Sequence, residues 1–295
     1  MNGSLQYRTA DFVPIPAWRR WWPVAAQEFA SLFRTKGGIA MFCACLLPGV
    51  YKLVMLLILF GVVNFAPRGL QARLQRAEVG LDPHRIEFYL EPVLSVRPGM
   101  IFALLLTSLV TSRAVARDRV TNALELYWTR SISPGAYLFA KWVGCGLLFA
   151  VFTVAVPTVL WITSALLADD AERVLATAPQ LARAILGLAA VTGAWTALCI
   201  LVSTMCSAPN TAMVSWSVLL VGSAAIAFVL SRALQQPSLM SCLSVWDAGA
   251  VVARGIAGVP QRGASVTGVV TTLLALLAAF WWIAQRRLRL AEAIR

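Results

Sequence analysis

Long apolar stretches separated by short charged ones dominate the pattern of this chain. Six runs are close to or longer than the ~20 residues that a helix needs to cross the hydrocarbon core of a bilayer. None of them alternates apolar and polar residues as the strands of a membrane barrel do, so each run predicts a helix. We therefore expect an all-α polytopic membrane protein with a single transmembrane domain. Its predicted spans are residues 39–66, 98–115, 137–167, 181–204, 211–230 and 264–284.

The segment before the first span has the pattern of an amphipathic helix. Residues 18–36 place Trp22, Ala25 and Phe29 on one helical face, and three tryptophans lie next to two arginines. Tryptophan and arginine are typical of helices in the headgroup layer, so we predict an N-terminal interfacial helix. A soluble N-terminal helix is the alternative.

Two longer polar segments, residues 67–97 and 232–262, are predicted on the outer side of the membrane. In the first segment, Leu70, Leu74 and Leu81 fall at near-helical spacing before Asp82-Pro83. The pattern repeats after it within residues 86–90, at Ile86, Tyr89 and Leu90. This pattern predicts two short surface helices that are broken at the proline. The second segment predicts a re-entrant or surface helix marked by Val245, Trp246 and Val252.

Residues 116–136 form a long charged segment between the second and third spans. Within it, Leu124, Tyr127 and Trp128 recur at helical spacing and predict a short apolar helix face. A short amphipathic helix held at the membrane surface is suited to docking onto a soluble partner. The alternative is an ordinary intracellular loop, which is basic because such loops usually are.

Two helix-start signals lie in or next to this segment. Asn122 is followed three residues later by Glu125, so each side chain can bond the free backbone N–H of the other. Ser133 followed by Pro134 predicts a second start, with serine as the N-cap and proline at the first helical position.

The composition supports a membrane protein and narrows the candidate chemistry. Hydrophobic residues make up 59% of the chain and charged residues only 13%, against about 25% charged residues in soluble domains. The formal net charge is +12, but the basic residues mostly flank apolar runs. Topology and anionic headgroups therefore explain them better than nucleic-acid binding does. The six cysteines form neither a disulfide framework nor a set with metal-ligand spacing, so no metal and no cofactor are expected.

The distribution of basic residues predicts the orientation. Six spans place both termini on one side of the membrane. Lys and Arg are more numerous in the N-terminal segment, in residues 113–141 and in the C-terminal tail than in the outer segments. By the positive-inside rule both termini are expected in the cytoplasm, with the protein in a cell membrane, most simply the bacterial inner membrane.

Lys52 is a charged residue inside the first predicted span, four residues after Pro48. A lysine at membrane depth costs roughly 2.5–3.5 kcal/mol on insertion scales, so such a residue is a functional candidate by default. A structural role is the alternative, in which the ammonium bonds carbonyls freed at a proline kink or extends toward the headgroups.

The central segment carries a family resemblance. Ala116-Arg117-Asp118-Arg119, then residues 122–128 (Asn-Ala-Leu-Glu-Leu-Tyr-Trp), Ser131-Ile132-Ser133, Tyr137 and Lys141 together resemble the ABC-2 type permease family. The six-span layout extends the resemblance over almost the whole chain. Ala140 stands where the family usually has glycine, and Ile132 stands where a proline is common.

The resemblance implies a membrane subunit of an ATP-binding cassette transporter, a class whose members often export their substrates. It also implies a cytoplasmic segment that contacts an ATPase, and a second permease subunit in a homodimer or heterodimer. The chain has no G-x-x-x-x-G-K-[ST] loop for ATP phosphates, so a separate subunit would supply the ATPase activity. The residues expected at the ATPase contact are Arg117, Asp118, Arg119, Leu124, Glu125, Tyr127 and Trp128.

Three other functions compete with this one. An intramembrane protease or an ion-coupled carrier would need carboxylates or histidines at membrane depth, and the predicted spans contain no Asp, Glu or His. An ABC-2 type subunit that transmits ATP-driven motion to another protein, without moving a solute, is harder to dismiss. The long outer segments are compatible with that role and with transport, and the sequence does not name a substrate.

Overall fold

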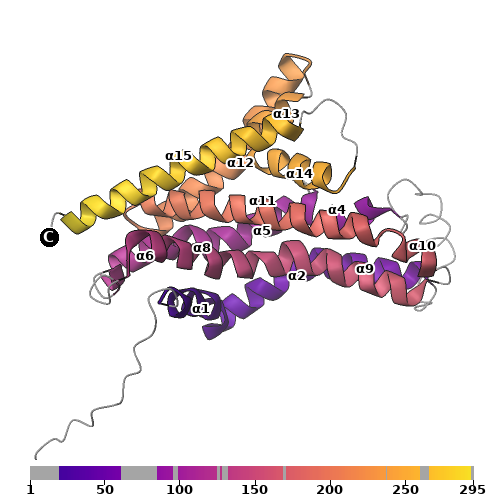
Figure 1. Cartoon of the computed structure of the whole chain (residues 1–295), viewed down its shortest axis with the longest axis horizontal. Coiled ribbons are helices and arrows are strands. Elements are labelled where there is room, and N and C mark those ends of the chain that lie inside the picture. The colour runs from indigo at the N-terminus through magenta and orange to yellow at the C-terminus, as the bar shows by residue number, and fades with distance from the viewer. Residues whose placement is uncertain are drawn as a thin grey trace, which may run out of the picture.

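The apolar runs form the longest helices, because in lipid a helix satisfies its own backbone N–H and C=O groups. The computed structural model describes residues 20–60, 85–95, 99–124, 127, 132–168, 171–236, 238–259 and 266–293, and these residues form helices and no strand. Most of the helices run along one common direction (Figure 1). They are α1 (Trp22–Ser31), η2 (Leu32–Arg34), α2 (Lys36–Leu59), α4 (Ile86–Leu94), α5 (Gly99–Leu109), η3 (Thr111–Arg113), α6 (Ala114–Val120), α8 (Pro134–Ala150), η4 (Val151–Ala155), α9 (Val156–Leu167), α10 (Ala171–Leu175), α11 (Ala178–Met205), α12 (Pro209–Ala233), α13 (Ser238–Leu243), α14 (Val245–Ile256) and α15 (Val266–Ala293).

Six helical stretches are long and apolar enough to cross a membrane, which confirms the predicted number of spans within the described part of the chain. The chain is therefore an all-helical protein of the multi-pass membrane type. The second stretch continues to Val120, five residues beyond its predicted end, and the first predicted end at residue 66 lies outside the described residues. The six stretches are Lys36–Leu59, Gly99–Val120, Pro134–Leu167, Ala178–Met205, Pro209–Ala233 and Val269–Arg287.

The second span is not one continuous α-helix. A 3-10 turn, η3, separates α5 from α6. The hydroxyl of Ser203 in α11 accepts hydrogen bonds from the backbone N–H groups of Val115 and Ala116, both at 3.0 Å. The first N–H groups of a helix have no acceptor within that helix, so Ser203 satisfies two groups that the break leaves free. The fourth span thus holds the second one at its interruption.

The third span is irregular next to Pro157, where the sequence predicts a kink. The π-helical turn η4 ends two residues before this proline. Proline removes one backbone hydrogen bond and its ring clashes with the preceding turn, and a π-bulge is a common way to absorb that clash. At the same turn Thr153 and Thr192 of α11 place their hydroxyl oxygens 2.6 Å apart. The irregular turn is therefore fixed against the fourth span.

The helix α4 corrects the prediction of a surface helix in residues 86–90. Only Glu87 and Glu91 are exposed in α4, while every other residue of this helix is buried against α9, α5 and α2. Because apolar residues cover nearly all sides of the helix, it gains more from burial inside the bundle than on its surface. The partner helix predicted before Pro83 lies outside the described residues.

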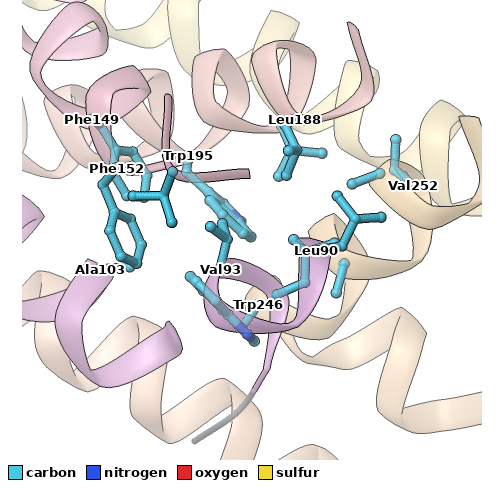
Figure 2. Packing of buried hydrophobic residues seen from close by; sticks show 14 of the residues in the cluster. Leu90, Val93, Ala103, Phe149, Phe152, Leu188, Trp195, Trp246 and Val252 are labelled. Carbon is cyan, nitrogen blue, oxygen red and sulfur yellow. The ribbon is translucent and has the colours of Figure 1, made fainter. Parts of the chain in front are cut away.

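The helix α14 packs against α11 through a pair of tryptophans (Figure 2). The rings of Trp195 and Trp246 are stacked, with centroids 4.3 Å apart and an angle of 8° between planes. The Trp195 Nε1–H also donates to the carbonyl of Val245 at 3.1 Å. A helix is therefore confirmed at Val245, and its Trp246 side chain is buried rather than lying free on the surface.

Candidate functional site: a buried ion cluster

Helices α1 and α6 and the start of α8 lie toward one end of the bundle (Figure 1). Charged side chains from these three helices form ion pairs with one another. The Nζ of Lys141 in α8 lies 2.6 Å from Oε2 of Glu28 in α1 and 2.6 Å from Oδ2 of Asp118 in α6. Arg117 Nη2 donates to the other Glu28 oxygen, Oε1, at 2.8 Å. The hydroxyl of Tyr137 donates to Asp118 Oδ2 at 3.0 Å. We call these five residues the ion cluster.

Local sequence explains how α8 presents its part of the cluster. Ser133 is the N-cap of α8, its side chain accepts from the N–H of Ala136, and Pro134 occupies the first turn. The helix start predicted from Ser133-Pro134 is therefore confirmed. Tyr137 and Lys141 are four residues apart, so they lie on the same face of this helix.

A close helix contact brings Glu28 to Lys141. A Cβ atom built on Gly144 in α8 would lie 2.5 Å from the carbonyl oxygen of Ala25 and 2.9 Å from Glu28 Cβ. Small residues let membrane helices approach this closely. Gly144 is one helical turn beyond Lys141 on α8. The close approach of α1 at Gly144 therefore also places the Glu28 carboxylate opposite the Lys141 ammonium group.

The cluster is withdrawn from solvent except on one side. The side chains of Lys141, Glu28 and Asp118 expose 1%, 2% and 8% of their surface, whereas Arg117 exposes 45%. Two positive groups face two carboxylates, so the charges balance. Removing several ions from water costs several kcal/mol for each ion and is repaid only by close, well-oriented pairing. The arrangement is therefore a rigid tie between α1, α6 and α8.

Tyr127 borders the cluster from the predicted coupling segment. Its ring lies 5.4 Å from that of Tyr137, measured between centroids. Burial raises the pKa of the Tyr127 hydroxyl, and the negative charge of Asp118 raises it further. A low-dielectric setting and a nearby anion both disfavour the phenolate. Tyr127 therefore stays a neutral hydrogen-bonding group at physiological pH.

Arg119 lies on α6, as Asp118 does, but its side chain bonds a different helix. Its guanidinium donates to the carbonyl oxygens of Thr204 and Cys206 at 3.1 Å each, at the C-terminal end of α11. The last carbonyls of a helix lack N–H donors within it and lie at its negative dipole end, so a guanidinium is favourable there. The second span is thus joined to the fourth at Arg119 and at Ser203.

The structure places the predicted contact residues in different environments. Leu124 is buried in an apolar cluster with Val24, Ala25 and Leu138, so it faces the inside of the chain. Arg117 remains partly exposed, while Asp118 is covered by its partners. Glu125 and Trp128 lie outside the described residues.

Asn122 lies between α6 and a helical stretch that includes Ala123 and Leu124, while Glu125, its predicted capping partner, lies outside the described residues. It has a positive φ of 54°. It follows the last turn of α6, and its N–H bonds the carbonyl of Arg119. Asparagine tolerates this left-handed conformation at helix ends, so Asn122 terminates α6.

Lys52 has an acidic partner that the sequence did not reveal. Its ammonium forms an ion pair with Glu91 of α4 and lies 4.8 Å from the centre of the Phe88 ring. The expectation of backbone carbonyls or headgroups as partners missed this pair, because Glu91 belongs to a segment predicted to lie outside the spans. Glu91 is half exposed. The pair joins the first span to α4.

Sequence reasoning missed Glu28, the residue at the centre of the cluster. The available signal was its position three residues after Ala25 and four before Leu32, on the apolar face of the predicted N-terminal helix. A carboxylate on such a face predicts a buried cation nearby. Among the described residues, no group of three or more His, Cys, Asp or Glu side chains could hold a metal ion.

Compared with known proteins, the chain matches no protein-family model and no curated protein sequence.

Proposed function

We propose that this chain is the membrane permease subunit of an ATP-binding cassette transporter, which exports a substrate with energy from a separate ATPase subunit. The observation that carries the proposal is that the ion cluster joins the two ends of the predicted coupling segment, residues 116–136. Asp118 lies at the start of this segment and Tyr137 just after its end, and the two are hydrogen-bonded to each other. A force on the segment would therefore reach the second and third spans together.

The geometry supports a specific route for that force. The ATPase subunits close on ATP and displace residues 116–136. Lys141 holds both Asp118 and Glu28, so α8 and α1 follow the displaced segment. Arg119 transmits the same displacement to the end of α11. Two copies of the chain, or this chain and a related one, enclose the path of the substrate.

The first experiment identifies the partner. The tagged chain is purified from its native membranes in mild detergent, and the proteins that copurify are identified by mass spectrometry. The proposal expects an ATPase with a phosphate-binding loop in stoichiometric amounts. Recovery of the intact chain without any nucleotide hydrolase, in several detergents, would contradict it.

The second experiment tests coupling in the reconstituted complex. Trp128→Ala and Glu125→Gln are each expected to reduce transport at least tenfold relative to ATP hydrolysis, with normal membrane insertion. Trp282→Ala is the matched control, since Trp282 lies on α15 with 55% of its surface exposed. If coupling is unchanged in Trp128→Ala and Glu125→Gln, or if Trp282→Ala loses as much transport relative to ATP hydrolysis, then this segment does not couple the two.

The reconstituted complex also distinguishes export of a substrate from transmission of ATP-driven motion to another protein. Vesicles that contain only this chain and its ATPase are expected to accumulate substrate when ATP is added outside. ATP hydrolysis without movement of any candidate substrate, together with a conformational response in a third protein, would favour the transmitter role instead.

A further inference from the structure

A second polar site lies beside the ion cluster, where the first span begins. A cavity of about 380 Å³ is formed between η2 and the first turns of α2 on one side and the α5–α6 junction on the other. Its wall combines apolar side chains with two guanidinium groups. The residues around it are Ser31, Leu32, Thr35, Gly37, Gly38, Met41, Leu109, Val110, Arg113 and Arg117.

Arg113 brings a positive charge that no carboxylate among the described residues neutralises. The side chain of Arg113 forms no hydrogen bond and no ion pair with the described residues, whereas that of Arg117 bonds Glu28. The ion cluster is already balanced, with two positive groups and two carboxylates. An arginine that is half buried beside apolar walls is expected to take an anion, because its charge is poorly hydrated there.

The other groups at the cavity favour a phosphate. The first turn of α2 borders it, and a helix N-terminus attracts anions through its free N–H groups and its dipole. Guanidinium groups bind phosphate oxygens in a bidentate manner more readily than ammonium groups do. Beside Gly37 the space is open, since a Cβ atom there would meet nothing within 4 Å.

The apolar wall and the level of the site favour a phosphate carried by a lipid. Leu32, Met41, Leu109 and Val110 would face the glycerol backbone and the upper acyl chains. Thr35 lines the cavity and directly precedes Lys36, the first residue of a stretch long and apolar enough to span a membrane. We therefore expect the site at headgroup depth. Basic pockets between membrane helices at this depth are known to suit anionic headgroups.

We propose that this cavity binds the phosphate group of an anionic phospholipid, with Arg113 as its main charged contact. The lipid bridges the start of α2 and the α5–α6 junction, next to the helix that carries Asp118. This inference does not depend on the proposed transport function, since any membrane protein with this geometry would hold the lipid.

Native mass spectrometry of the purified full chain, with phosphatidylglycerol or phosphatidylcholine added at equal concentration, tests the proposal. The wild-type chain is expected to retain phosphatidylglycerol, and Arg113→Gln is expected to weaken that retention about tenfold, the effect of losing one charge-assisted hydrogen bond. Arg183→Gln is the matched control, because Arg183 is exposed on α11 and does not line the cavity. An equal loss in the control, or equal retention of phosphatidylcholine, would overturn the site.

A second variant fills the cavity without changing its charge. Gly37→Leu places a side chain in the open space and should reduce phosphatidylglycerol retention while the thermal unfolding midpoint stays unchanged. Gly37→Leu tests the site even if Arg113→Gln fails to fold. Full retention of phosphatidylglycerol in Gly37→Leu would show that the lipid does not bind in this cavity. Millimolar inorganic phosphate should leave the lipid bound, and its displacement would assign the site to soluble phosphate and overturn the lipid assignment.

Discussion

Glu28 and Lys141 are 113 positions apart in sequence, and they form an ion pair of 2.6 Å in which neither side chain exposes more than 2% of its surface. A buried pair of this kind adds little net stability compared with apolar packing, because both ions lose their hydration. Its effect is on specificity, since either ion left alone in the interior would be costly. The pair therefore fixes one position of α1 against α8.

Removing the ammonium group of this pair should destabilise the protein strongly. We expect Lys141→Met to reduce the free energy of unfolding by about 3–5 kcal/mol, because two carboxylates would lose their shared counter-ion in the interior. The lower end of this range is expected, since Glu28 keeps its bond from Arg117 and Asp118 keeps its bond from Tyr137. The measurement is a denaturant titration in mixed micelles.

Lys36→Met is the matched control for this change. Lys36 is the first residue of α2, it is exposed, and the positive end of the helix dipole makes a cation unfavourable there. The control is expected to change the free energy of unfolding by less than about 0.5 kcal/mol, as for most surface substitutions. Equal effects of the two substitutions would show that the buried cluster does not hold these helices together.

The titration of Tyr127 gives a pH test of the same cluster. Burial raises the pKa of its hydroxyl above the ordinary value of 10.0, with a further contribution from the Asp118 carboxylate. The folded state thus keeps a proton that the unfolded state releases. The resulting stabilisation is complete below pH 10 and is lost as pH rises through the folded-state pKa.

The measurement is the ultraviolet absorbance of tyrosinate in the wild type minus that in Tyr127→Phe. The difference should titrate above pH 10. Asp118→Asn should shift it to lower pH, because the variant removes the nearby negative charge. A difference spectrum that titrates at or below pH 10 in the wild type would place Tyr127 in water rather than beside the cluster.

The spans could be predicted from the sequence because their signal is local. Length and hydrophobicity are properties of one segment, and the cap at Ser133-Pro134 is a property of neighbouring residues. The extension of the second span to Val120 was missed because Arg117, Asp118 and Arg119 resemble a loop when their partners are unknown. Those partners lie on α1, α8 and α11, so no local window contains them.

The buried position of α4 was partly readable from its sequence. Ile86 to Leu94 is apolar on nearly every side, with its two glutamates four residues apart on one face. A helix of that composition is expected inside a bundle. The identity of its partners was not predictable, because Lys52 and Glu91 are brought together only by the tertiary fold.

The tryptophan pair between α11 and α14 depends on a glycine. A Cβ atom on Gly249 would lie 2.4 Å from Cζ2 of Trp195 and 2.8 Å from Cγ1 of Val191. We expect Gly249→Ala to cost about 1–3 kcal/mol of unfolding free energy, since rigid ring and branched neighbours must move. Gly222→Ala on α12 is the control, because its added methyl group would meet Val218 at an ordinary 3.9 Å. A neutral or stabilising effect of Gly249→Ala would mean that α14 does not pack this closely.

The contact at Gly144 makes a prediction that links packing to the ion cluster. Gly144→Ala would place a methyl group 2.5 Å from the carbonyl oxygen of Ala25, and backbone atoms cannot yield as a flexible side chain does. We expect α1 to move away from α8, at a cost of about 1–3 kcal/mol. The Glu28–Lys141 pair should weaken with it, because Glu28 lies on the displaced face.

Gly146→Ala on the same helix is the control for this contact, with Thr196 as its nearest neighbour at 3.9 Å. A double-mutant cycle separates packing from charge. Glu28→Gln should cost less in the Gly144→Ala background than in the wild type, since the pair is already loosened there. It should cost the same in the Gly146→Ala background. If the two glycine variants behave alike in stability and in the cycle, then the cluster is not held by this helix contact, and the tie between α1 and α8 must come from the apolar residues around it.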